Sequence, residues 1–371
     1  TTSAPVEIPS GSSLGANTFW QGSVPLDDDA MLDLGYHYPK LDYVIDDVQL
    51  NPGVTLTVEA GTALGIASHG IHLEQSASLV LNGSPSDRIE FFSQSDFQES
   101  RTPGAPVYAT PAYLSFNSGS PGGSLIAVAI RYSDFNSGAG AAYEFLNSNG
   151  PLSQSVKDLT IRDSRFFHGV LSMNDSVGTT QVILNNQFWE THLSLRGQQE
   201  LDFRNNHVAS SEMDYLQTSG SGLWTLKDNV FTELDPTVNG TLVNAGHGHN
   251  AYVNTGERIG GTTHGSDLIL SSLAYESGPY GDYYQLSSSP LINAGSQGGD
   301  AAGLYHHTVL VGGAPEALPG AVTVVDIGFH YPAIDAGTGE LLDVDSDTLV
   351  NIVEDLNGNG LQDPGESPWQ V

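Results

Sequence analysis

Five short stretches in the middle of the chain repeat one pattern of apolar and polar positions. They align without gaps, and their last residues are spaced 31, 22, 20 and 23 positions apart. The stretches are IRYSDF (130–135), IRDSRF (161–166), ILNNQF (183–188), FRNNHV (203–208) and LKDNVF (226–231). A short strand and a polar turn that recur about every 22 residues predict a solenoid.

Stacked coils of a parallel β-helix explain this pattern, because each residue would lie about 4.8 Å above its counterpart in the coil below. The apolar columns that start at Ile130 and Phe135 would fill the interior. The Ser and Asn column between them, which starts at Ser133, would form a hydrogen-bonded ladder. TLTVEAGT (55–62) and SLVLNGS (78–84) share the rhythm at a spacing of 23. The alternative is a β-sandwich whose strands align by accident.

The sequence of the early repeats resembles the first coils of right-handed parallel β-helix repeat proteins that bacteria secrete. The segments that carry this resemblance are TLTVEAGTAL (55–64) and GIHLEQSASLVLNGSPSDRIEFFS (70–93). The resemblance covers roughly residues 41–300 and implies an all-β, right-handed parallel β-helix. It implies little about chemistry, since this fold carries lyases, hydrolases, adhesins and structural proteins.

The amino-acid composition narrows the classes of molecule that the chain could bind. The chain has 43 acidic and 11 basic residues and a formal net charge of −32, which repels nucleic acid and anionic membranes and favours divalent cations. It has no cysteine, so disulfides and thiolate metal sites are excluded. No apolar run is long enough to span a membrane. The opening TTSAPVEIPSGSS reads as a mature end left after removal of a signal or pro-segment, so we expect a secreted protein.

Two consecutive twelve-residue segments near the C-terminus fit EF-hand-type calcium loops, whose alternating oxygen ligands converge on one ion. The ligand positions of the first are Asp343, Asp345, Asp347, Leu349, Asn351 and Glu354. Those of the second are Asp355, Asn357, Asn359, Leu361, Asp363 and Glu366. Gly360 supplies the sharp turn of the second loop, whereas Thr348 stands there in the first, which we expect to be weaker or distorted. The alternative is a solvated acidic tail.

The tandem resembles thrombospondin type 3 and dockerin-like repeats, which implies structural Ca²⁺ and an extracellular setting. The expected organisation therefore has four parts. They are an N-terminal extended adaptor or cap segment (1–40), the parallel β-helix (41–300), an irregular closing segment (301–334) and the tandem calcium-loop region (335–371).

Candidate catalytic residues are sparse. Asp163 and Asp228 share one column with Asn185 and Asn205 between them, so they would lie three coils, or about 14 Å, apart, too far for a carboxylate pair. The histidines His168, His247 and His249 are predicted in turns or flexible loops, where a structural role is the more common one. No GxSxG or HExxH motif is present, so an enzyme is the less favoured interpretation.

Four of the basic residues stack in one outward column: Arg131, Arg162, Arg204 and Lys227. This stripe could bind an acidic extracellular glycan or an acidic face of another subunit. The alternative is local salt bridging to Asp163, Asp202 and Asp228, which contributes little at a surface.

A final feature is a repeated phrase, LDLGYHYP (32–39) and VDIGFHYP (325–332). The end of a β-helix exposes unpaired strand edges and core, so we expect Tyr36, His37 and Tyr38 to cover a coil end, of the same chain or of a neighbouring copy. Contact with another copy would be head to tail and would build a filament or surface layer. Three functions remain open: a self-assembling structural solenoid, a glycan-binding or adhesive module, and a polysaccharide lyase or hydrolase.

Overall fold

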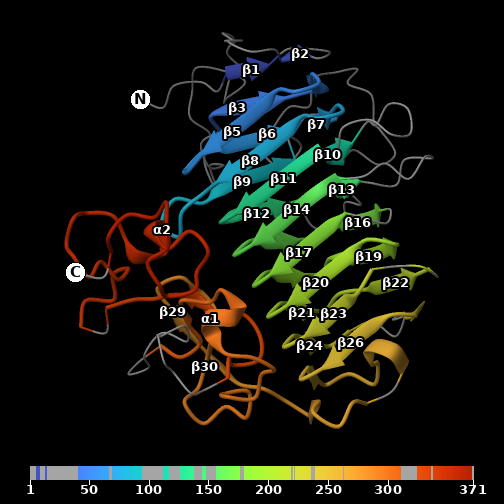
Figure 1. The fold of residues 1–371 in the computed structure, drawn as a ribbon, viewed down its shortest axis with the longest axis vertical. Coiled ribbons are helices and arrows are strands. Elements are labelled where there is room, and N and C mark those ends of the chain that lie inside the picture. The colour runs from blue at the N-terminus through green and yellow to red at the C-terminus, as the bar shows by residue number, and fades with distance from the viewer. Residues whose placement is uncertain are drawn as a thin grey trace, which may run out of the picture.

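The computed structural model describes residues 6–8, 13–14, 41–66, 69–93, 112–116, 126–137, 144–147, 156–175, 179–218, 220, 222–234, 239–261, 263–310, 324–335 and 337–369. Within them the chain is an all-β parallel solenoid, and Figure 1 shows its strands stacked along the long axis of the molecule. A C-terminal segment returns along one side of the stack.

Three parallel sheets form the solenoid. The 11-stranded sheet contains β1 (Val6–Ile8), β3 (Tyr43–Ile45), β6 (Ala63–Ile66), β9 (Ile89–Ser93), β12 (Ser133–Asn136), β15 (Arg165–Phe167), β18 (Gln187–Trp189), β21 (His207–Ala209), β24 (Val230–Thr232), β27 (Ala251–Val253) and β28 (Leu268–Leu270). The 9-stranded sheet contains β2 (Ser13–Leu14), β4 (Val48–Leu50), β7 (Ile71–Leu73), β10 (Ala112–Phe116), β13 (Glu144–Asn147), β16 (Val170–Asp175), β19 (His192–Gly197), β22 (Met213–Gln217) and β25 (Asn239–Thr241). The 8-stranded sheet contains β5 (Thr55–Glu59), β8 (Ser78–Asn82), β11 (Ile126–Arg131), β14 (Val156–Arg162), β17 (Thr180–Leu184), β20 (Glu200–Arg204), β23 (Trp224–Lys227) and β26 (Ala245–Gly248).

The register of these sheets confirms the alignment of the five repeated stretches. The first apolar column pairs in the order Ile130, Ile161, Ile183, Phe203 and Leu226. The last column pairs in the order Phe135, Phe166, Phe188, Val208 and Phe231. All ten side chains are buried, and consecutive phenylalanine rings of the last column stack face to face, as Phe166 does on Phe188 with centroids 5.0 Å apart.

The predicted polar ladder is also present, and it is buried. Each member accepts a hydrogen bond from the backbone N–H of the coil before it, as Asn206 does from Asn186 at 2.9 Å and Asn229 does from Asn206 at 3.0 Å. The ladder begins at Ser164, which accepts from Ser133, and it runs on through Asn250. Each step satisfies a backbone donor that would otherwise be buried without a partner.

The coils continue beyond Pro236, where the sequence pattern fades. His247 lies in β26 and pairs with Leu226, not in a flexible loop, and His249 occupies the turn that follows. The pattern is masked because small and polar residues replace the apolar ones in the motif GHGHNAY (246–252). The last strand of the parallel sheets, β28, ends at Leu270, so the expected boundary at residue 300 lies beyond it.

At the other end, the N-terminal segment contributes strands to its own solenoid. β1 pairs in parallel with β3, and β2 pairs with β4. Tyr36, His37 and Tyr38 lie outside the described residues, so the structure gives no position for the first copy of the repeated phrase.

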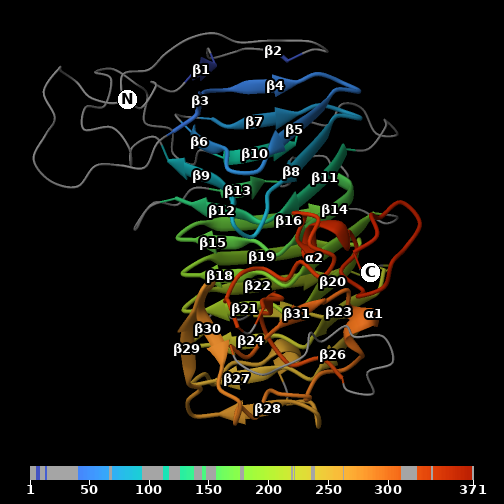
Figure 2. The same ribbon diagram turned by 90° about the vertical axis from the view of Figure 1, so that its left-hand side faces the viewer.

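The C-terminal segment, which consists of the described residues that follow β28 from position 271 on, has little regular structure. It contains two antiparallel pairs, β29 (Tyr275–Gly278) with β30 (Gly281–Gln285) and β31 (His306–His307) with β32 (Tyr331–Pro332). Its two described helices, α1 (Gly299–Ala302) and α2 (Asn351–Glu354), are short. A further short helix, η2 (Ile259–Gly261), lies between β27 and β28. Figure 2 shows this segment lying against the strands of the middle and later coils. Across the described ranges no helix is long and apolar enough to cross a membrane.

Candidate functional site

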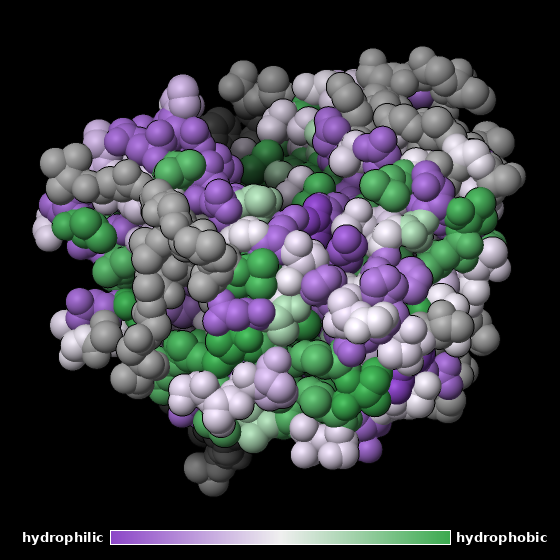
Figure 3. Space-filling view, turned by 60° about the horizontal axis from the view of Figure 1, so that its bottom comes forward, coloured by the Kyte–Doolittle hydropathy of each residue, from purple (hydrophilic) through white to green (hydrophobic). Residues whose placement is uncertain are grey.

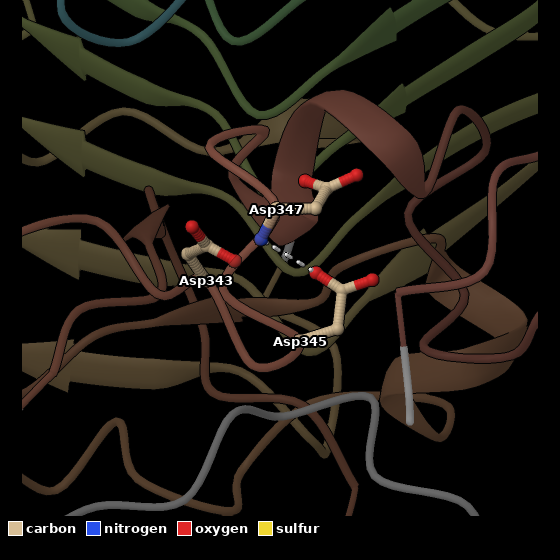
Figure 4. Close-up of side chains that lie close together, drawn as sticks. All are labelled: Asp343, Asp345 and Asp347. Carbon is tan, nitrogen blue, oxygen red and sulfur yellow. Dashed lines mark hydrogen bonds between the residues drawn. The ribbon is translucent and has the colours of Figure 1, made fainter.

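The first predicted calcium loop brings three carboxylates together. One carboxylate oxygen from each of Asp343, Asp345 and Asp347 lies within 4.8 Å of the others. Figure 4 shows the three side chains projecting from one short loop. Backbone amides support this shape, because Asp343 accepts hydrogen bonds from the N–H groups of Ser346 at 2.7 Å and Thr348 at 3.2 Å. Alternate residues of a tight loop therefore present hard oxygen ligands to one region, as a calcium site requires.

Glu354 completes the first loop as a buried carboxylate. The residue is only 3% exposed, and neither of its carboxylate oxygens meets the geometry of a hydrogen bond with any described residue. Burial, followed by the charges of Asp347, Asp345 and Asp343, raises its pKa, and the Ser367 side chain opposes this rise only in part. A buried carboxylate without a full partner is unfavourable, and either a proton or a bound cation would relieve the cost. The final ligand position of the motif therefore holds a carboxylate that is available to a cation.

Two other ligand positions of this loop form hydrogen bonds with neighbouring residues of the same loop. Asn351 is buried, and its Oδ1 accepts the N–H of Val344 at 2.9 Å. Leu349, expected to offer its carbonyl, donates its N–H to Asp347 at 2.8 Å. Thr348 has a φ of 88°, in the left-handed region where a side chain is strained. This is the position that normally holds glycine, so the loop forms at a cost in backbone energy.

The second loop is more fully hydrogen-bonded within itself. Asp355 is buried and accepts the N–H groups of Asn359 at 3.1 Å and Gly360 at 2.7 Å, with Gly360 at a φ of 73°. Asn357 and Asn359 each donate their Nδ2 to Asp363 at 2.7 Å. The remaining ligand positions also form hydrogen bonds within the loop. Glu366 accepts two backbone N–H groups, and Leu361 donates its backbone N–H to Asn359. A calcium ion would replace the two amide-to-carboxylate bonds with oxygen ligation.

Two arginines of the basic stripe, Arg131 and Arg162, hold these loops against the solenoid. Arg131, Arg162, Arg204 and Lys227 stack in register on successive strands of the 8-stranded sheet, with Leu184 between the second and third. The side chains of the first three are 15%, 11% and 20% exposed, so most of their surface is covered.

The partners of the stripe belong to the same chain. Arg131 donates to the carbonyl of Ile352 in α2 at 3.2 Å, and Arg162 donates to the carbonyl of Asn357 in the second loop at 3.2 Å. Arg204 forms an ion pair with Asp202 in the same strand. Arg131 and Arg162 of the stripe therefore join the calcium-loop region to the flank of the solenoid.

Asp163 is the centre of this junction. Its carboxylate is 1% exposed and lies 3.1 Å from Arg131 Nε, 2.9 Å from Arg162 Nε and 3.2 Å from His306 Nε2. Asn185 Nδ2 donates to it at 2.8 Å. Burial alone would raise the pKa of Asp163, but the charges of Arg162, His306 and Arg131 hold it well below its usual value. The residue acts as a charged link between the coils and the C-terminal segment.

The column that contains Asp163 also binds the second copy of the repeated phrase. Asp163, Asn185, Asn205 and Asp228 all have φ between 52° and 60°, and Asn and Asp tolerate this left-handed conformation best. Asn205 Nδ2 donates to the carbonyl of Asp326 at 3.1 Å. The turn residues of the coils therefore provide the groups that the phrase binds.

A backbone contact extends this attachment to the next coil. Gly328 donates its N–H to the carbonyl of Asp228 at 2.8 Å, and no side chain mediates this bond. The phrase VDIGFHYP therefore lies along the flank of the solenoid and not over a coil end, because its backbone bonds the turn residues of successive coils.

Close packing fixes the phrase in this position. Gly328 has a φ of 103°, and a Cβ atom there would lie 2.7 Å from Val230 Cγ2. Asp326 accepts the N–H of Asn293 at 2.6 Å and the hydroxyl of Thr308. The Tyr331 ring stacks on Tyr284 with centroids 4.0 Å apart. These three shared positions of the phrase thus have defined contacts.

Asp163, Asp228, His168 and His249 among the candidate catalytic residues are engaged in structural contacts, whereas the buried Nδ1 of His247 has no hydrogen-bond partner among the described residues. Asp163 and Asp228 are three coils apart, as predicted, and Asp228 accepts the N–H and hydroxyl of Ser296 at 2.7 Å each. His168 Nδ1 lies 3.0 Å from Glu190, and His249 Nδ1 lies 3.0 Å from the carbonyl of Ala294.

Sequence reasoning missed the docking role of this column, including its partners His306 and His330. The signal was present, since four Asn or Asp residues recur at one turn position. Comparisons of the chain with family models, with curated proteins and with solved structures give no match. Function is therefore inferred from the geometry.

Proposed function

We propose that this chain is a secreted structural solenoid, a right-handed parallel β-helix, that Ca²⁺ stabilises through its C-terminal loops. Copies of it would assemble head to tail into an extracellular filament or surface layer. The observation that carries the calcium part is Glu354, a buried carboxylate without a hydrogen-bond partner of good geometry among the described residues, beside three aspartates.

A structural role for calcium follows from where the loops lie. Arg131 and Arg162 bond the carbonyls of Ile352 and Asn357, so the backbone that would carry the ions is tied directly to the coils. An ion that orders this backbone would also stabilise the contact between the C-terminal segment and the flank. Binding to the folded state alone contributes about 2.7 kcal/mol per site at a hundred times the dissociation constant.

A substitution at Glu354 tests the proposal through a change of sign. In EGTA, Glu354→Gln should raise the melting temperature, because it removes a buried charge that lacks a counter-charge. In millimolar calcium the same variant should melt below the wild-type chain, because a ligand is lost. Thermal melts of both proteins in both buffers measure the effect.

The matched control is Glu366→Gln in the second loop. Glu366 accepts the N–H groups of Leu356 at 2.9 Å and Asp363 at 2.8 Å, so the variant should lower the melting temperature even in EGTA. Identical wild-type melting curves in calcium and in EGTA would refute a stabilising role for calcium.

The glycan-binding alternative is less favoured at the basic stripe. Arg131, Arg162 and Arg204 contact carbonyls and carboxylates of this chain, which leaves less of the stripe for a glycan. The structural proposal explains the same residues as the attachment of the calcium loops.

A further inference from the structure

The 11-stranded sheet contains one continuous apolar column whose last member is half exposed. In register, the column consists of Val6, Tyr43, Leu64, Phe91, Phe135, Phe166, Phe188, Val208, Phe231, Tyr252 and Ile269. Its members from Leu64 to Tyr252 are buried, whereas Tyr43 near one end is 40% exposed and Ile269 at the other end is 49% exposed. Ile269 is exposed because β28 is the last strand of the sheet.

The same end of the solenoid presents strand edges. β28, β25 and β26 are the terminal strands of the three sheets, and among the described strands each has a neighbour on one side only. Val243, which follows β25, is 56% exposed. Figure 3 shows hydrophobic side chains gathered on this end, in the lower part of the view. Exposed apolar surface beside free strand edges is typical of an interaction site.

We infer that this end binds the opposite end of a second copy of the chain, with β28 of one copy pairing in parallel with β1 of the next. The inference rests on the proposed self-assembly and names its interface. The argument for this occupant is continuity, because β1, β2 and β5 are the terminal strands of the same three parallel sheets at the other end.

The register of the sheet would continue across the junction. Val6 is the first register position and Ile269 is the last, so parallel pairing of β28 with β1 would set these two positions opposite each other. Contact between two different ends leaves a free end on each side, and such a heterologous contact propagates.

Charge makes the association depend on the ionic conditions. Each copy has a formal net charge of −32, so copies repel one another at low ionic strength. Salt screens this repulsion, and bound calcium lowers the net charge. Assembly should therefore strengthen as sodium chloride or calcium is added.

Engineered disulfides test the contact directly, because the natural chain has no cysteine. Paired positions on adjacent parallel strands lie within the Cα separation that a disulfide spans. The double variant Val6→Cys, Ile269→Cys should form a ladder of covalent multimers on a non-reducing gel after mild oxidation in calcium. Reducing agent should return the ladder to single chains.

The matched control is Val6→Cys, Leu216→Cys. Leu216 is 42% exposed but lies in β22, which has a partner strand on each side, so this variant should form no ladder. Melting curves of both variants establish that they fold. Absence of a ladder in the first variant, or equal ladders in both, would overturn the inferred interface. Because the Glu354→Gln melts are independent of the ladder, failure of the interface and failure of the calcium proposal are distinguishable.

Discussion

The side-chain amide of Asn185 forms two hydrogen bonds with the backbone of one residue, His330. Asn185 Oδ1 accepts the His330 N–H at 2.7 Å, and Asn185 Nδ2 donates to the His330 carbonyl at 2.9 Å. The pair is buried and joins residues 145 positions apart. A single turn residue of the solenoid therefore satisfies both backbone polar groups of His330 in the C-terminal segment.

We expect Asn185→Gly to destabilise the chain by about 1–3 kcal/mol, because it leaves two buried backbone groups without partners. Glycine accepts the φ of 57° without strain, so the substitution removes only the side-chain hydrogen bonds, which include the one to Asp163. The free energy of unfolding from urea titration measures the loss. Asn254→Gly is the control, since Asn254 has a φ of 49° but bonds an exposed glutamate. Equal effects of the two variants would contradict the docking role of Asn185.

Truncation of the stacked phenylalanines tests the core. Phe166→Ala and Phe188→Ala should each lower the free energy of unfolding by about 3–5 kcal/mol, as expected for buried aromatic side chains. The double variant should deviate from the sum of the two, because the rings are in contact. Losses below about 1 kcal/mol for both single variants would be inconsistent with the coil register.

Thr348 offers a gain of stability. Because its φ is 88°, Thr348→Gly should relieve backbone strain of about 1 kcal/mol in the first loop. The variant should bind calcium more tightly in isothermal titration, and it should melt higher in calcium. An unchanged or weaker affinity would show that the strained turn does not limit the first loop.

Buried histidines predict a loss of stability in mild acid. Burial lowers the pKa of His330 to about 3 and that of His307 to about 4, below the value of about 6.5 for an exposed histidine. Between about pH 6.5 and pH 5 the unfolded chain therefore binds protons that the folded chain does not. Stability should fall as the pH falls, by up to about 1.4 kcal/mol per pH unit for each histidine.

Urea titrations at several pH values within this window provide the measurement. His330→Gln should reduce the slope of the unfolding free energy against pH by about 1.4 kcal/mol per pH unit, which corresponds to the uptake of one proton. A slope equal to that of the wild-type chain would mean that His330 is not a buried neutral group.

The solenoid was predictable because its coils repeat. Apolar residues such as Phe166 and Phe188 recur at one position of each coil, and the interior of a β-helix requires this. The pattern failed near His247, where polar and small residues form a strand that pairs in parallel with the strand of the preceding coil. Periodicity detects a coil only when the coil itself contains the apolar residues.

The candidate site was predictable only in part. The spacing of Asp343, Asp345 and Asp347 predicted that their carboxylates lie close together, because the three residues are local in sequence. The roles of Arg131 and Asp163 depend on residues more than a hundred positions away, such as Ile352 and His306. A column of like residues indicates a common environment, but it does not say whether that environment is solvent, a ligand or the returning chain.

Sedimentation velocity of the intact chain, with millimolar calcium and with EGTA, tests the central claim most directly. The account predicts particles many times heavier than a single chain in calcium, and dissociation toward single chains when EGTA removes the ion. A single species with the mass of one chain in calcium, at micromolar concentration and moderate salt, would contradict the self-assembling, calcium-stabilised solenoid.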